Sequence, residues 1–130
     1  QMSDTDYSTW HNDELDVTIA VRVFDWTSPR ITSQNRLAGT PRGTDYRETM
    51  GRPSEDAAAM LLVIEAMRKR GWWCRIESPC GDEATWMARF AHPLQVAWRS
   101  VSRDSTPQRA VCIAALRALD SMEDHHEQGQ

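Results

Sequence analysis

The sequence predicts a single α+β domain in which an antiparallel three-stranded sheet lies between helical layers, an α-β-α sandwich with the element order α-α-β-β-β-α. Three observations predict this fold. The chain has 130 residues, the size of one domain. Three segments combine helical apolar spacing with helix start and stop signals. Three short runs between residues 72 and 101 alternate, with apolar side chains on both faces, so their sheet needs helices on both sides.

The first helix is expected to begin near Asp13 and to end at Thr27-Ser28-Pro29. Leu15 and Ile19 belong to an apolar stripe at helical spacing, and acidic residues in the first turn suit the helix dipole. Residues 1–12, which precede this helix, are polar and acidic. We therefore expect a disordered N-terminal segment and a folded domain over residues 13–121.

Residues 27–53 are expected to form a long loop, because they hold three prolines, three glycines and many small polar residues. Five of the chain's fourteen arginines fall here, against only Asp45 and Glu48, which makes the segment +3 in a chain of net charge −4. Planar guanidinium groups suit phosphates and carboxylates. The loop is therefore the first candidate for binding an anion.

The second helix is expected from a Ser54 N-cap to a Gly71 stop, and three short strands follow it at residues 72–77, 85–91 and 96–101. Alternation along these strands puts Arg75, Arg89 and Arg99 on the faces opposite to their apolar neighbours. If the strand register aligns them, they form a positive stripe on the sheet.

The last helix has Thr106 as its expected N-cap and Pro107 at its first position, and it is expected to end near Ser121. Residues 122–130 are expected to be a flexible tail. Since a three-stranded sheet leaves two unpaired edges, we expect two or more copies to associate as a homodimer or higher homo-oligomer.

Composition excludes several classes of function. The net charge of −4 argues against a general nucleic-acid binder, and no sequence-specific nucleic-acid binding is expected. No apolar run is long enough to span a membrane, and no secretion signal is visible, so a cytoplasmic location is expected. The three cysteines lack metal-ligand spacing, and no nucleophile, P-loop or zinc-protease motif is present. We therefore expect no catalytic residues, no metal and no cofactor.

The candidate ligand-binding residues combine cations with one aromatic side chain and one hydroxyl. The loop supplies most of them, and the start of the last helix supplies the rest, since a helix N-terminus favours phosphate. Arg109 is included because a cation in the first turn of a helix opposes the helix dipole. The full set is Arg30, Arg36, Arg42, Tyr46, Arg47, Arg52, Arg103, Thr106 and Arg109.

Three blocks of the chain resemble the phage ABA sandwich domain, a family of small phage and prophage proteins. They are ELDVTIA at 14–20 with VFDW at 23–26, SEDAAA at 54–59 continuing to residue 71, and STPQRAVCIAAL at 105–116. With the tryptophan-bearing strands they cover most of residues 13–120. The resemblance implies a sheet between helical layers and a phage accessory protein. In size, class and charge the chain is also similar to phage anti-Thoeris proteins, which sequester cyclic nucleotide signals between subunits.

Two functions follow as expectations. The first is a non-enzymatic phage anti-defence protein that sequesters a small anionic, cyclic nucleotide in the cytoplasm of an infected or lysogenic bacterium. The alternative is an inhibitor that binds a bacterial defence enzyme, as anti-CRISPR proteins do, or a phage accessory protein of structural type. The acidic N-terminal stretch favours the inhibitor, since it could mimic nucleic acid: Asp4, Asp6, Asp13, Glu14 and Asp16.

Overall fold

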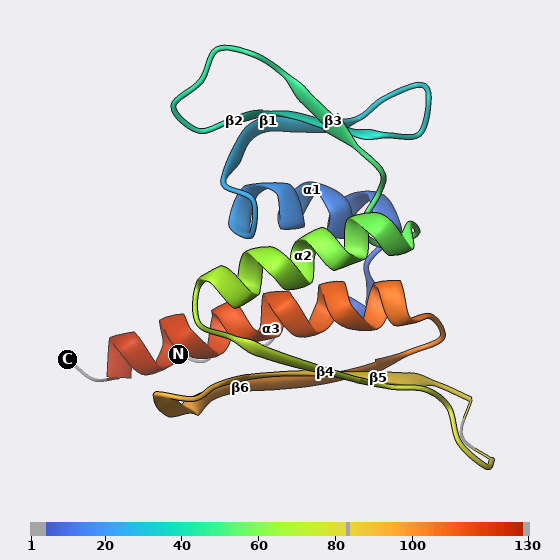
Figure 1. Cartoon of the computed structure of the whole chain (residues 1–130), viewed down its shortest axis with the longest axis vertical. Helices are drawn as coiled ribbons and strands as arrows, with labels where there is room; N and C mark the ends of the chain where they lie inside the picture. The colour runs from blue at the N-terminus through green and yellow to red at the C-terminus, as the bar shows by residue number, and fades with distance from the viewer. Residues whose placement is uncertain (1–4, 83, 129–130) are drawn as a thin grey trace.

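Three helices form the middle of the molecule, and a three-stranded sheet covers them on each side (Figure 1). The computed structural model describes residues 5–82 and 84–128. Its elements are η1 (Tyr7–Thr9), α1 (Asn12–Arg22), β1 (Trp26–Ile31), β2 (Leu37–Pro41), β3 (Glu48–Met50), α2 (Ala57–Lys69), β4 (Trp73–Glu77), β5 (Trp86–His92), β6 (Gln95–Asp104) and α3 (Pro107–Gln128).

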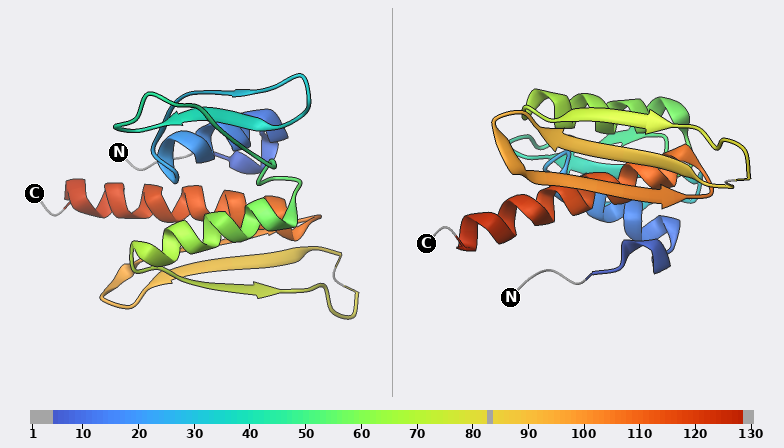
Figure 2. Two further views of the ribbon diagram at one scale, coloured as in Figure 1. Left: turned by 45° about the horizontal axis from the view of Figure 1, so that its top comes forward. Right: turned by 90° about the horizontal axis from the view of Figure 1, so that it is seen from below.

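The predicted α+β class is confirmed, but the predicted single sheet between helices is wrong. The strands β1-β2-β3 form sheet A and β4-β5-β6 form sheet B, both antiparallel. The helices lie between the sheets (Figure 2). The predicted order missed one meander, because α1 and α2 are each followed by three strands.

Sheet B is the meander that the alternation predicted, with strand ends shifted by up to three residues. Cys74 lies opposite Phe90, and Ile76 lies opposite Ala88, on the face that packs against the helices. α3 crosses this face over β5 and β6. Phe90 is fully buried there among the apolar side chains of α3. The main core therefore lies between sheet B and the helices.

Sheet A spans residues 26–50, nearly all of them within the segment 27–53 that was expected to be a loop. Its central strand is buried at Leu37, and the Trp26 ring lies so close to Gly39 that a Cβ atom there would be 2.7 Å from the ring. β1 is irregular at Ser28, where φ is 51° and the register shifts. Strands this short and rich in small polar residues lack the apolar alternation that identifies a strand in a sequence.

Within the described residues, secondary structure extends further toward both ends of the chain than predicted. In the segment predicted to be disordered, Tyr7 is only 4% exposed, and its hydroxyl donates to Asp120 Oδ2 at 2.7 Å. α3 begins at Pro107 as predicted but continues beyond Ser121 to Gln128, and Met122 packs against the core. Residues 1–4 and 129–130 of the predicted flexible ends lie outside the described residues.

The start of α2 differs from the prediction, while its end agrees with it. Asp56 rather than Ser54 caps the helix, accepting from the Ala58 N–H at 2.9 Å. Ser54 instead bonds to a buried carboxylate of α1. Gly71 follows the helix with a φ of 95°, the left-handed conformation that glycine adopts without strain.

Candidate functional site

The structure divides the predicted ligand residues among three places. Arg52 and Arg109 meet beside the first turns of the helices. Five residues lie on or around sheet A, namely Arg30, Arg36, Arg42, Tyr46 and Arg47. The remaining two flank the start of α3. Thr106 accepts from the Arg109 backbone N–H at 3.2 Å, and Arg103 belongs to β6.

Arg52 is bound within the fold and is only 7% exposed. It donates to Asp16 Oδ2 at 2.7 Å and to Asn35 Oδ1 at 2.6 Å, and it also pairs with Asp13. Asp16 is fully buried and accepts from the Ser54 N–H at 2.8 Å. Burial raises the pKa of Asp16, and the hydrogen bonds from Arg52 and Ser54 oppose that rise. This arginine therefore joins α1, sheet A and the start of α2.

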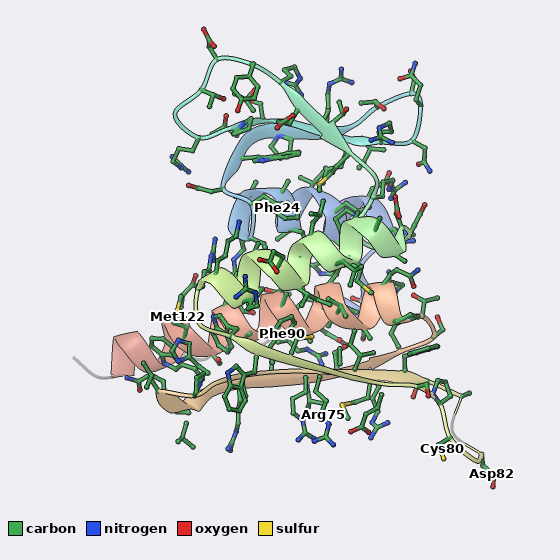
Figure 3. All side chains as sticks on the ribbon, in the orientation of Figure 1. Phe24, Arg75, Cys80, Asp82, Phe90 and Met122 are labelled. Carbon is green, nitrogen blue, oxygen red and sulfur yellow. The ribbon has the colours of Figure 1, made fainter. Side chains whose placement is uncertain are left out.

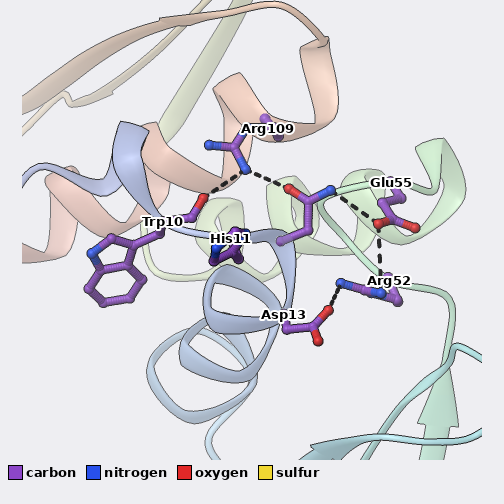
Figure 4. A pocket seen from close by; sticks show the side chains of 7 residues that line it. Trp10, His11, Asp13, Arg52, Glu55 and Arg109 are labelled. Carbon is purple, nitrogen blue, oxygen red and sulfur yellow. Dashed lines mark hydrogen bonds and ion pairs between the residues drawn. The ribbon is translucent and has the colours of Figure 1, made fainter.

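Arg109 likewise joins separate segments of the chain, at the start of α3. It donates to the Trp10 carbonyl at 3.1 Å and to Asn12 Oδ1, and it pairs with Asp104 at 3.2 Å. Asn12 links Arg109 to Glu55, because its side-chain oxygen accepts from Arg109 and its amide donates to Glu55 at 3.1 Å. Figure 4 shows Arg109 and Glu55 in this network. The groove around this network measures about 390 Å³. Its arginines are matched by carboxylates and by amide and carbonyl oxygens, so it offers an anion little unused charge.

The acidic N-terminal stretch is also used inside the fold. Asp6 accepts from the Ser8 N–H and so caps η1. Glu14 accepts from the His11 N–H at the start of α1. Asp13 and Asp16 hold Arg52, and Asp4 lies outside the described residues. A nucleic-acid mimic would need its carboxylates exposed and unpaired, whereas the four carboxylates of this stretch within the described residues have intramolecular partners.

The sheet A arginines do not converge on one cavity. Arg42 pairs with Asp25 at 2.7 Å, and Arg47 donates to the Ser28 carbonyl at 3.4 Å. Arg30 lies opposite Ala38. Arg36 belongs to the turn between β1 and β2, beside a second groove of about 490 Å³. β1 and β2 run away from this turn toward the β2–β3 connection, which carries Arg42 and Arg47 at the opposite end of sheet A (Figure 1).

The outer face of sheet B, which points away from the helices, brings a different set of arginines together. Arg75 lies directly opposite Arg89, and in the neighbouring row Ala91 of β5 lies between Trp73 of β4 and Arg99 of β6. The positive stripe expected from the alternation is therefore present in the register. Figure 3 shows Arg75 pointing away from the helical layer.

This face is exposed and carries unused positive charge. Trp73 is 67% exposed. Glu77 lies 3.3 Å from Arg75, both side chains being exposed. Among the described residues, Arg89 and Arg99 have no hydrogen-bond or ion-pair partner. We call the set Trp73, Arg75, Arg89 and Arg99 the cationic face.

The spacing of the cationic face suits a phosphate-bearing ligand. Side chains directly opposite on neighbouring strands are about 5 Å apart, and diagonal neighbours are about 8 Å apart. Guanidinium groups at these distances can share one phosphate or hold two adjacent ones. The Trp73 indole offers a flat surface on which a base can stack. Arg103, on the same side of β6, borders this face and has a partner of its own.

The sequence contained a signal for this face that the predicted ligand set did not use. Period-2 alternation placed the three arginines on one side, but only the register shows that Arg75 and Arg89 are opposite each other. Trp73 follows Trp72, which is 1% exposed and belongs to the core, and successive side chains of a strand point to opposite faces, so the pair places one indole on each face.

Two absences concern the part of the chain that the structure describes. Within residues 5–82 and 84–128, no group of three or more histidine, cysteine or acidic side chains is placed to hold a metal ion. No helix in that part has both the length and the apolar character needed to cross a bilayer.

Comparisons with known proteins show likeness in fold. No protein-family model matches the chain, and no curated protein matches it. The 2.0 Å crystal structure of a phage protein from Bacillus cereus ATCC 14579 has a TM-score of 0.60 to this chain at 13% identity. The match covers 89% of this chain and 94% of that one. The chain therefore has the fold of a phage protein.

Proposed function

We propose that this is a non-enzymatic phage anti-defence protein that binds and sequesters a small anionic nucleotide on its cationic face. The observation that carries the proposal is the alignment of Arg75, Arg89 and Arg99 with an exposed Trp73 on the face of sheet B that points away from the helices. Two of these guanidinium groups have no partner in the described part of the chain. This moves the expected ligand contacts from the sheet A segment to sheet B.

The phage context is supported by the fold shared with the Bacillus cereus protein. Membership of the phage ABA sandwich family is part of the same proposal, although the layers here have helices between sheets rather than a sheet between helices. The proposed location is the cytoplasm of the infected or lysogenic bacterium, where nucleotide immune signals are produced.

The proposed binding mode follows from the chemistry of the face. Arg89 and Arg99 donate to phosphate oxygens, which are the acceptors that match a planar guanidinium best. Trp73 stacks on the base. Because the face consists of guanidinium groups and one indole on a sheet surface, it selects for compact charge and an aromatic ring and makes few contacts to base edges.

The test is a thermal-shift screen against cyclic and linear nucleotides, with recovery of the ligand after denaturation. At a ligand concentration of a hundred times Kd, we expect stabilisation of about 2.7 kcal/mol, or roughly 10 °C for this chain length. The double variant R89A/R99A should lose the shift. R30A/R36A is the matched control, since it removes two exposed arginines from sheet A.

Each outcome of this screen is decisive. If the shift is lost in R30A/R36A and kept in R89A/R99A, the ligand binds at sheet A and the cationic face is the wrong site. If no nucleotide shifts the wild-type protein, sequestration of these nucleotides is refuted. If the ligand is recovered cleaved, the protein is an enzyme.

A protein inhibitor is the second candidate, and a specific observation favours it. Leu94, Val96 and Val101 are 85%, 79% and 47% exposed on and beside β6, next to the cationic face. Exposed apolar side chains beside unpaired cations are typical of a surface that binds an acidic protein. A pull-down with L94E/V96E as the control bait would separate this binding from capture by charge alone.

A further inference from the structure

One flank of sheet B has two unpartnered features side by side. β4 is an edge strand of the sheet, and α2 packs beside it, as both views of Figure 2 show. α2 exposes Leu61 and Leu62, at 58% and 48%, on the side that also carries the exposed Ala58. An open strand edge next to exposed leucines leaves both hydrogen-bonding groups and apolar surface without a partner.

The other three sheet edges carry features that oppose pairing. β1 is irregular at Ser28 and contains Pro29, which has no N–H to donate. β3 has only three residues. On β6, Arg117 donates to the Val101 carbonyl at 3.0 Å and so occupies an edge acceptor. In the described part of the chain no side chain bonds to the β4 backbone, which leaves β4 as the open edge.

We propose that a second copy of this chain pairs antiparallel along β4, which joins two copies of sheet B into one six-stranded sheet and packs α2 against α2. The inference goes beyond the proposed function and does not depend on it. Pairing of two strand edges satisfies the free backbone groups of both copies, and the adjoining helices cover each other's leucines.

Charge selects the register of this pairing. Centred on Ile76, the pairing overlaps residues 75–77 of the two strands and places Arg75 opposite the partner's Glu77 twice, once on each side of the two-fold axis. Centred one residue earlier, it would place Arg75 opposite the partner's Arg75, and like charges directly opposite are destabilising. Centred on Cys74, it would place Trp73 opposite the partner's Arg75 and would pair neither charge with an unlike one.

In the register centred on Ile76, the outer faces of the two sheets B lie on the same side of the joined sheet. The two cationic faces therefore become parts of one continuous surface. The two pairs of Arg75 with the partner's Glu77 lie at its centre. Arg89 and Arg99 of each copy then flank this centre. A ligand larger than one nucleotide could contact both copies.

The test measures mass in solution by sedimentation velocity. A chain of 14.9 kDa should sediment as a dimer of about 30 kDa. R75E places glutamates opposite each other across the seam, and E77R does the same with arginines. Each variant alone should have a dimer dissociation constant raised by about tenfold or more, because two attractive pairs become repulsive.

Mixing the two variants is the decisive step. In a heterodimer of R75E with E77R every opposite pair is again of unlike charge, although the pair within each chain stays broken. The mixture should therefore regain the wild-type dissociation constant. L94E is the matched control and should remain dimeric, because it changes a leucine that is 85% exposed at the β5–β6 turn.

Both charged side chains are exposed, so folding of these variants should be unaffected, and circular dichroism checks this. L62E provides a second probe on α2 and should also yield monomers. A monomeric wild type overturns the proposal. It is equally overturned if R75E and E77R stay dimeric, or if their mixture stays monomeric.

Discussion

The buried pair of Arg52 and Asp16 offers the sharpest test of what holds the fold together. In D16N the arginine loses its partner at 2.7 Å, and the Ser54 N–H and hydroxyl lose a charged acceptor. Asp16 is fully buried and Arg52 is 7% exposed, so water cannot replace these contacts. Removing one partner of a buried ion pair costs about 3–5 kcal/mol.

That cost translates into a large change in melting temperature. With an unfolding entropy of about 2.1 cal/mol/K per residue, a chain of 130 residues loses roughly 11–18 °C. The assay is thermal and urea unfolding followed by circular dichroism. D13N is the control, because Asp13 binds the same guanidinium but its side chain is 69% exposed. We expect D13N to cost at most about 1 kcal/mol.

A double-mutant cycle extends this test. If Arg52 and Asp16 act as one unit, R52M/D16N should cost clearly less than the two single variants together. The reasoning is refuted if D16N melts within about 3 °C of D13N, or if the two single costs simply add. Either result would mean that the buried pair contributes no more than an exposed one.

Three further predictions concern single residues. G39A should cost about 1–3 kcal/mol and shift the tryptophan fluorescence, because the new Cβ atom would lie 2.7 Å from the Trp26 ring. Burial raises the pKa of Tyr7 to about 12, so the wild-type protein should keep this contribution to stability below pH 10 and lose it as the pH rises to 12. Y7F should lack that alkaline loss in urea titrations, while costing about 1 kcal/mol at pH 7 from the lost hydroxyl bonds. In a thiol titration of the native protein at pH 8, Cys80 at the tip of the β4–β5 loop (Figure 3) should react quickly, because it is exposed. Cys74, whose pKa burial raises to about 11, should react slowly, and equal rates for these two would contradict the packing of sheet B.

Much of sheet B and of the helix ends could be predicted from the sequence, because their signals are local. Alternation of period 2 in β4, β5 and β6 reports which side chains face the core. Pro107 and Gly71 mark a helix start and a helix stop through backbone constraints that need no partner. The arginines of the cationic face were assigned to one side of the sheet by the same alternation.

The sequence alone determined these local features, together with the absence of a known catalytic motif. Sheet A and the partners of the arginines were decided by tertiary contacts. Sheet A depends on Trp26 lying across Gly39 rather than on a repeated pattern of apolar residues. Arg52 looks in the sequence like a free loop cation, yet its main partner stands 36 residues earlier in the chain. The composition of a segment reports its cations, but whether a cation is free for a ligand depends on which distant carboxylates the fold brings to it, and only the tertiary structure settles that.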